Sequence, residues 1–261
     1  MNKRRAMVLC GYGINCDYET EYVLKASGFE ARRVHVHELV ERPTMLQDFD
    51  LMALPGGFSY GDDLGSGRVL ANKMKFRLRN ELEAFVAQGK LVIGICNGFQ
   101  MIAKMGLLPY NKFVQETTVG PNASGKFEDR WVYLKANQKS QCVFTKGISG
   151  LMLPVRHGEG NFMADQETLR DLKAKEMIAL QYVNEAGELA GYPYNPNGAA
   201  LNIAGICNEQ GNVLGMMPHP EAYNSMTNNP YWTEVKDRIK DWKGAGMKIF
   251  ENAAAYLDEK F

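Results

Sequence analysis

The chain has 261 residues, 45% of them hydrophobic, and its 30 basic side chains balance its 30 acidic ones. This length allows one large hydrophobic core, whereas the zero net charge lacks the basic footprint of a nucleic-acid binder, and no apolar run approaches the roughly 20 residues that span a bilayer. The five cysteines include no C-x-x-C pair, so we expect neither a disulfide framework nor a zinc knuckle, but a cytoplasmic protein that binds no nucleic acid and no membrane.

The N-terminal part of the chain alternates predicted strands with helices, the strands at residues 6–10, 30–36, 50–57 and 91–96, and the helices at residues 19–28 and 72–90. Tyr22 and Ala26 have helical spacing in the first helix. Gly28 and Gly89 supply the stops of the two helices. The alternation predicts an α/β fold with a mainly parallel central sheet covered by helices on both faces. Ligands bind such sheets at the carboxyl ends of strands, where "PGGFSYGDD" and "ICNGF" fall.

Residues beyond 110 follow a different pattern, with further strands joined by turn-rich links. These strands are predicted at residues 130–136, 177–183, 201–207 and 212–218. The segment "GYPYNPNGA" at 191–199 is predicted to be a loop, because its prolines and glycines continue neither a helix nor a central strand. Residues 231–258 are predicted to form one or two helices, interrupted near Gly244 and Gly246. No repeat or linker divides the chain, so we expect residues 1–261 to form a single domain.

Two glycine-rich segments come close to nucleotide-binding motifs. The segment "GPNASGKF" at 120–127 begins like a phosphate-binding loop, but Phe127 stands where Ser or Thr should bind magnesium, and a strand follows instead of a helix. The segment "GYGINC" at 11–16 resembles a dinucleotide fingerprint whose third glycine is replaced by Cys16. We interpret the first as a surface turn and the second as a loop that lines a cleft.

His35 and His37 alternate along the predicted strand, so they are expected to share one face of it. Two such histidines can bind a metal ion, but the sequence places no third ligand nearby. We therefore interpret both as structural and expect no metal site and no cofactor in this chain.

The segment "GICNGFQ", residues 94–100, has the G-x-C-x-G form of a nucleophile elbow between a strand and a helix. Small residues are needed around such a turn, which explains Gly94 and Gly98. The turn would place the Cys96 sulfur at a helix N-terminus, where the positive end of the helix favours the thiolate, and would leave the Asn97 N–H free for an oxyanion. The pattern alone leaves a nucleophile and an inert buried cysteine equally open.

A cysteine nucleophile needs a base, and two histidines remain for that role. His219 lies in "MMPHPEAY", where the flanking prolines predict a stiff, extended segment that places Glu221 beside the imidazole. Together with Cys96 they would form a nucleophile–base–orienter triad. His157, with Glu159 at the same spacing, is the rival base and ranks second because its surroundings are rich in glycine.

A second oxyanion donor is expected from "LPGGFSYGDD", which lies at the same edge of the predicted sheet. Glycines let backbone approach a ligand closely, so we predict donors at the backbone N–H groups of Gly57 and Phe58. For residues 61–67, the later part of this loop, a flexible glycine turn remains a credible interpretation.

Taken together, these motifs resemble those of the class I (triad) glutamine amidotransferases, and most closely the glutaminase subunits of phosphoribosylformylglycinamidine synthase. The resemblance covers roughly residues 6–221 and rests on "GGFSYGDDLGSGRV", "NASGKF", "GICNGFQ", "HGEG", "YPYNPNG", "NIAGICN" and "GMMPHPE". It implies the flavodoxin-like fold of that family. Ala222 and Tyr12 depart from the family pattern, where Arg and Pro are usual.

The resemblance also implies roles for single residues. Cys96 would be the nucleophile, His219 the general base and acid, and Glu221 its partner. The loop at Gly57 would supply an oxyanion donor. A further pair, Gln100 and His157, is expected to hold the substrate.

The activity implied is hydrolysis of L-glutamine to glutamate and ammonia through a cysteinyl thioester. A partner synthetase subunit, joined by a small accessory subunit, would use this ammonia with ATP and magnesium to make formylglycinamidine ribonucleotide in purine biosynthesis. Two rival functions stay open at this point. One is a free-standing cysteine hydrolase on a related fold, and the other is a subunit that only mediates interactions.

Overall fold

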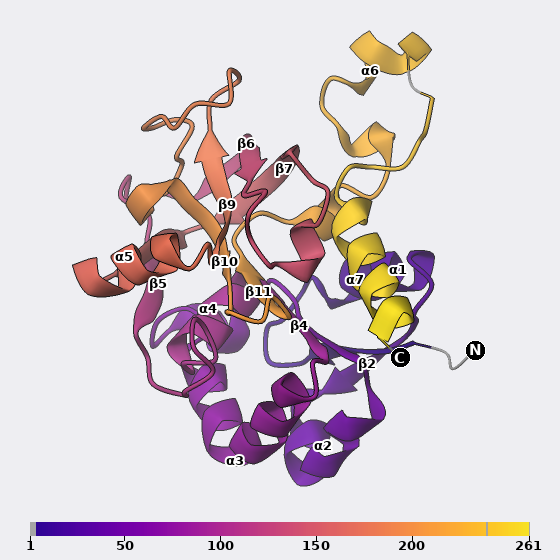
Figure 1. Ribbon diagram of the computed structural model, residues 1–261, viewed down its shortest axis with the longest axis vertical. Coiled ribbons are helices and arrows are strands. Elements are labelled where there is room, and N and C mark those ends of the chain that lie inside the picture. The colour runs from indigo at the N-terminus through magenta and orange to yellow at the C-terminus, as the bar shows by residue number, and fades with distance from the viewer. Residues whose placement is uncertain (1–3, 239, 261) are drawn as a thin grey trace.

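The computed structural model describes residues 4–238 and 240–260, which form a central sheet with helices packed around it (Figure 1). The strands are β1 (Arg5–Cys10), β2 (Glu30–His35), β3 (Leu51–Leu54), β4 (Leu91–Ile95), β5 (Thr117–Pro121), β6 (Glu128–Ala136), β7 (Gly150–His157), β8 (Glu159–Ala164), β9 (Ile178–Val183), β10 (Ile203–Cys207) and β11 (Val213–Met216). In the part of the chain that is described, nine of them form one sheet in the order β2-β1-β3-β4-β11-β10-β9-β6-β7. The other two, β5 and β8, form an antiparallel pair.

Helices cover the sheet on both sides. They are α1 (Asp17–Ala26), α2 (Val36–Glu41), α3 (Arg68–Ala87), α4 (Asn97–Lys104), α5 (Gln166–Ala174), α6 (Trp232–Val235) and α7 (Met247–Lys260). Figure 1 shows α1 and α7 side by side on one side of the central strands, and α3 with α4 on the other. Across residues 4–238 and 240–260, no helix is both long and apolar enough to pass through a membrane.

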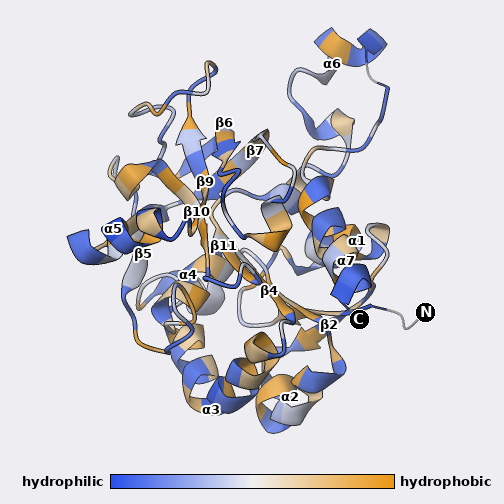
Figure 2. Cartoon of the chain, in the orientation of Figure 1, coloured by the Kyte–Doolittle hydropathy of each residue, from blue (hydrophilic) through white to orange (hydrophobic). Residues whose placement is uncertain are grey.

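The two halves of the sheet differ in strand direction. β2, β1, β3, β4 and β11 pair in parallel, whereas β10, β9, β6 and β7 continue the sheet with antiparallel pairings. The parallel half has the 2-1-3-4-5 order of flavodoxin-like folds, with β11 in the fifth position. Every residue of β3 and β4 is buried, and Figure 2 shows the central strands in hydrophobic colours. The predicted α/β class is therefore confirmed, and its parallel part is the part that ends at the candidate site.

Several predicted details of the N-terminal half are wrong. The helix expected at residues 19–28 is present as α1, with Thr20, Val23 and Leu24 buried, but it begins at Asp17 and ends at Ala26. The strand at His35 ends there, and His37 lies on α2, so the two histidines do not share a strand face. The His35 ring nitrogen instead accepts the His37 backbone N–H at 3.2 Å and caps the helix.

Of the one or two helices predicted for residues 231–258, the second is present as α7, whereas the first is reduced to the short helix α6 within an extended excursion. Residues 225–238 and 240–243 leave the body of the molecule and carry the four-residue helix α6 (Figure 1), while α7 begins directly after Gly246. A Cβ atom at Gly246 would lie 2.0 Å from the Pro220 carbonyl oxygen, and one at Gly244 would lie 2.3 Å from the Tyr223 carbonyl oxygen. These glycines therefore let the base of the excursion pack closely against residues 220–223.

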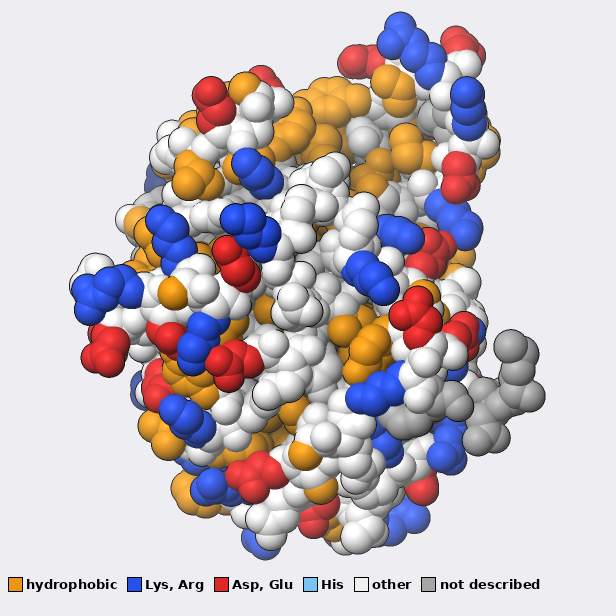
Figure 3. Space-filling model, viewed as in Figure 1, with side chains coloured by type: hydrophobic (Ala, Val, Ile, Leu, Met, Phe, Trp, Pro, Cys, Tyr) orange, Lys and Arg blue, Asp and Glu red, His pale blue; other side chains and the backbone are white. Residues whose placement is uncertain are grey.

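The surface mixes charges of both signs. On the face that Figure 3 shows, Lys and Arg side chains are interspersed with Asp and Glu.

Candidate active site

Cys96 sits on a sharp turn between β4 and α4. Its backbone has φ 52° and ψ −107°, a strained conformation for a residue with a side chain, and such strain costs of the order of 1–3 kcal/mol. A Cβ atom at Gly98 would lie 1.8 Å from the Leu54 carbonyl oxygen, and one at Gly94 would lie 2.7 Å from the Gly98 carbonyl oxygen. The elbow therefore requires glycine at both positions, as the sequence pattern predicts.

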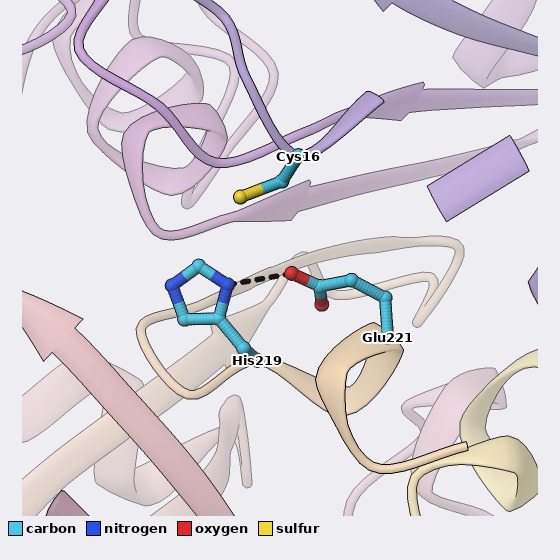
Figure 4. Close-up of side chains that lie close together, drawn as sticks. All are labelled: Cys16, His219 and Glu221. Carbon is cyan, nitrogen blue, oxygen red and sulfur yellow. Dashed lines mark hydrogen bonds and ion pairs between the residues drawn. The ribbon is translucent and has the colours of Figure 1, made fainter. Parts of the chain in front are cut away.

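His219 and Glu221 form a buried pair just beyond the end of β11, the parallel neighbour of β4. Glu221 Oε1 lies 2.5 Å from His219 Nδ1, and the two side chains are 1% and 0% exposed (Figure 4). The expected extended segment is wrong, because residues 220–222 form a turn of 3-10 helix. The turn nevertheless brings the carboxylate back to the imidazole, while the His219 backbone N–H donates to the Pro154 carbonyl at 2.9 Å.

The electrostatic surroundings favour the protonated form of His219. Burial by itself disfavours the imidazolium, but the Glu221 carboxylate and then the Cys96 sulfur raise the pKa of His219 well above its ordinary value. Among residues 4–238 and 240–260, neither His219 Nε2 nor Glu221 Oε2 has a hydrogen-bond partner. Buried polar atoms are almost always paired, so these two indicate a site that receives a further group.

A cavity of about 300 Å³ brings the thiol and the imidazole to one place. It is lined by Asn15, Cys16, Glu19, Gly57, Phe58, Cys96, Phe127, Arg156 and His219. Its walls come from segments that follow the carboxyl ends of β1, β3, β4 and β11, including the start of α1, from the end of β7, and from Phe127 just before β6. The predicted position of the site at the carboxyl edge of parallel strands is therefore observed, and the segment 11–16 lines a cleft as predicted.

The predicted oxyanion donors differ in availability. Within the described residues, the N–H groups of Asn97 and Gly57 donate to no acceptor, and Asn97 is the first residue of α4. The Phe58 N–H instead donates to the Gly13 carbonyl at 2.9 Å. Phe58 is therefore not free to stabilise an oxyanion in this structure, and the expectation for it is corrected.

The side chain of Asn97 ties this loop to the elbow. Its Oδ1 accepts the Ser59 N–H at 3.1 Å, and its Nδ2 lies 3.2 Å from Asp62 Oδ1. These bonds fix the loop that carries Gly57 relative to the nucleophile.

Gln100 and His157, predicted to hold the substrate, do not line the cavity. The Gln100 amide donates to the Glu159 carbonyl at 2.6 Å and accepts from the Asn97 amide at 2.8 Å, so it connects α4 to β8. His157 Nδ1 lies 3.0 Å from Asn122 Oδ1. Burial, followed by the charge of His219, lowers the pKa of His157 to about 3. Both side chains are buried, and their role in holding the substrate stays a prediction.

Sequence reasoning missed Glu19, Phe127 and Arg156 as residues of the cavity, and it placed Asn15 and Cys16 only within a segment expected to line a cleft. Arg156 forms an ion pair with Glu19, and its Nη2 lies 3.6 Å from Cys16 Sγ and 3.8 Å from Glu221 Oε1. Because side chains alternate along a strand, Arg156 faces the cavity when His157 faces the interior. That alternation in "PVRHGEG" is the signal in the sequence from which Arg156 could have been found.

Comparison with known proteins places this geometry in a family. A family model described as the CobB/CobQ-like glutamine amidotransferase domain matches residues 3–257. The "Phosphoribosylformylglycinamidine synthase subunit PurQ" of Dehalococcoides mccartyi is 43% identical over 98% of this chain and 98% of its own length. The protein of the same name from Treponema denticola is 42% identical over 91% of this chain and 94% of its own length.

Solved structures of glutamine amidotransferase proteins have a fold similar to that of this chain. A chain of the "Structure of PurLQS from Thermotoga maritima" superposes with a TM-score of 0.73 at 32% identity, covering 98% of this chain and 99% of that one. A glutamine amidotransferase from the same organism, 16% identical, has a similar fold with a TM-score of 0.52 over 100% of this chain and 94% of that one. The chain therefore belongs to the CobB/CobQ-like glutamine amidotransferase family, alongside the proteins named phosphoribosylformylglycinamidine synthase subunit PurQ.

Proposed function

We propose that this chain is the glutaminase subunit of a phosphoribosylformylglycinamidine synthase, with Cys96, His219 and Glu221 as its catalytic residues. The observation that carries the proposal is that the strained elbow thiol shares one cavity with His219, whose other side is paired with the buried Glu221. The similarity to PurQ proteins over nearly the whole chain supports the choice of reaction.

In the first step, the Cys96 thiolate attacks the side-chain carboxamide carbon of L-glutamine. The carbonyl oxygen becomes an oxyanion, for which the free N–H groups of Asn97 and Gly57 are the available donors. Losing one donor of this kind typically costs about 3 kcal/mol of the barrier. The C–N bond then breaks as the His219 imidazolium donates a proton to the leaving nitrogen, which departs as ammonia.

The second step hydrolyses the glutamyl thioester left on Cys96. His219, now neutral, takes a proton from water, and the hydroxide formed attacks the thioester carbon. Glutamate leaves and the thiolate is restored. Glu221 keeps the imidazole in one orientation and stabilises its charge each time it is protonated, which is the effect behind the raised pKa of His219.

The amino-acid end of glutamine needs partners of both charges, and the cavity provides them. Arg156 and Glu19 both line it and contact each other. We assign the Arg156 guanidinium to the α-carboxylate, which it can bind through two hydrogen bonds, and the Glu19 carboxylate to the α-ammonium group. An amide substrate that lacks an α-carboxylate and an α-ammonium group would leave Arg156 and Glu19 paired only with each other.

The ammonia would be used by a partner. Under this proposal an ATP-dependent synthetase subunit binds ATP and magnesium and consumes the ammonia, a small accessory subunit completes the complex, and the reaction takes place in the cytoplasm. The strand that follows residues 120–127 agrees with this division, because a phosphate-binding loop would be followed by a helix. Ammonia protonates readily in water, so transfer within a complex prevents its loss.

The test is to measure glutamine turnover by the purified chain before and after mixing with the synthetase subunit. We expect turnover to rise on mixing and a complex to elute as one species. Cys96→Ala should abolish turnover in the complex. Cys10→Ser, which changes a half-buried thiol that does not line the cavity, should leave it unchanged.

Labelling of Cys96 separates the rival functions. A glutamine-like electrophile should label it stoichiometrically, and glutamine should protect it. Absent labelling would favour an interaction-only subunit. Turnover of unrelated amides, with no response to the synthetase subunit and no complex, would favour a free-standing cysteine hydrolase.

A further inference from the structure

Cys16 is a cavity-lining thiol that the proposed reaction does not use. Its Sγ, one His219 ring nitrogen and a Glu221 carboxylate oxygen all lie within 4.8 Å of one another. Figure 4 shows the Cys16 sulfur directed toward the imidazole from the opposite side of the site. The backbone holds it there, because the Cys16 N–H donates to the Gly56 carbonyl at 3.1 Å.

The donor atoms of this cluster have spare capacity for a ligand. All three residues are buried, at 5%, 1% and 0% exposure for Cys16, His219 and Glu221. In the described part of the chain, His219 Nε2 and Glu221 Oε2 make no hydrogen bond. Thiolate sulfur, imidazole nitrogen and carboxylate oxygen together are the ligand types of zinc sites, and three protein ligands leave one position open.

We propose that Cys16, His219 and Glu221 form a binding site for a thiophilic divalent cation of the zinc class. Binding releases the Cys16 thiol proton and the proton shared by His219 and Glu221, and forms bonds from the metal to sulfur, nitrogen and oxygen. The Nδ1–Oε1 separation of 2.5 Å has to widen slightly, because the proton shared there is released and both side chains then bind the metal. Cys16 and His219 both line the cavity, which gives the ion its entry path.

Arg156 opposes this binding electrostatically. Its guanidinium lies 3.6 Å from Cys16 Sγ and 3.8 Å from Glu221 Oε1, so it would be next to the cation. Glu19 also contacts this guanidinium and can hold it on the outer side of the cluster. The site should therefore bind zinc reversibly, and loss of the Arg156 charge should strengthen binding.

A cation bound at this site would inhibit glutamine hydrolysis, a consequence that rests on the proposed function. A bound cation occupies the imidazole and the carboxylate that the reaction needs, so one ion per chain blocks turnover. The site would make the enzyme sensitive to free zinc, while removal of the ion by a chelator restores the pair.

The experiment measures metal binding directly and does not depend on activity. The full chain, kept reduced with a phosphine, is titrated with Zn²⁺ by calorimetry and with Cd²⁺ by the ultraviolet absorption of its thiolate bond. We expect one ion per chain in both titrations. Cys16→Ser should weaken Zn²⁺ binding by at least about tenfold, because loss of a residue that only hydrogen-bonds to a metal ligand already costs that much. Arg156→Gln should strengthen Zn²⁺ binding by about tenfold, because it removes a positive charge next to the cation.

Cys142 supplies the matched control, because it is a buried thiol that does not line the cavity. Its neighbour is the buried Cys207, whose Sγ lies 3.4 Å from Ser140 Oγ. Cys142→Ser should leave the titrations unchanged. The proposal is overturned if Cys142→Ser removes the bound ion, if Cys16→Ser binds as tightly as the original chain, or if Arg156→Gln binds no more tightly. Glutaminase activity without zinc binding would sink this inference alone and leave the proposed function standing.

Discussion

The two histidines near the elbow should respond in opposite ways to acid, and His157 gives the sharper test. It is 2% exposed, and burial, aided by the charge of His219, lowers its pKa to about 3 from an ordinary 6.5. The unfolded chain therefore binds a proton at this residue over a range of pH in which the folded chain does not. The stability that the neutral His157 contributes to the folded state is fully present above about pH 6.5, and it is lost as the pH falls toward about 3.

The size of this loss follows from the shift. One pKa unit corresponds to about 1.36 kcal/mol, so at about pH 4.5, roughly two units below 6.5, the folded state has lost about 2.7 kcal/mol through His157 alone. Little of this is offset by solvent, because the side chain is almost completely buried. Other groups also titrate in this range, so the comparison has to be made against a variant that lacks only this imidazole.

The assay is urea unfolding of the original chain and of His157→Gln at about pH 7 and about pH 4.5. The original chain should lose about 2.7 kcal/mol more than the variant between the two conditions. Equal losses in both proteins would refute the reasoning, since they would mean that His157 titrates normally when folded. The same result would reopen His157 as a candidate base.

Three further substitutions test the site and the elbow. Glu221→Gln should lower kcat/KM for glutamine by about 100-fold to 10,000-fold, the range of general acid–base catalysis, and an unchanged value in steady-state assays would remove Glu221 from the triad. Arg156→Gln should raise KM by about 10-fold to 100-fold with a smaller change in kcat, because a charged hydrogen bond to substrate is lost; a fall confined to kcat would contradict its assignment to the α-carboxylate. Gly98→Ala places a Cβ 1.8 Å from the Leu54 carbonyl oxygen and should cost about 1–3 kcal/mol of stability, whereas Gly191→Ala, where nothing lies within 4 Å, should leave the thermal midpoint unchanged.

The elbow could be predicted from sequence because its requirements are local. A strand, a cysteine between glycines and an amphipathic helix follow one another within residues 91–104, and the backbone there has the expected sharp turn. The position of His219 could be predicted for the same reason, as it directly follows the apolar strand β11. The geometry of Glu221 could not, since the turn at residues 220–222 replaces an extended chain without losing the contact.

Contacts between distant segments were beyond prediction. The Phe58 amide is taken by the Gly13 carbonyl, and the Gln100 amide by the Glu159 carbonyl, and neither pairing leaves a mark in the local sequence. The role of Arg156 depends on which face of β7 meets the cavity, which alternation alone leaves ambiguous. Tertiary context therefore decides whether the Phe58 amide is free and what the Gln100 amide binds.

The pairing of β4 with β11 is what makes the catalytic geometry possible. Ile95 pairs with Met216 in parallel register, and the next residue, Cys96, donates its N–H to the Met216 carbonyl at 2.8 Å. The elbow thus begins one residue beyond the last pair, and His219 follows three residues after Met216 on the neighbouring strand. A slip of one residue in this register would turn the side chains of β11 to the opposite face. The distance between thiol and imidazole is therefore set by backbone hydrogen bonds in the buried sheet, before any contact between the two side chains.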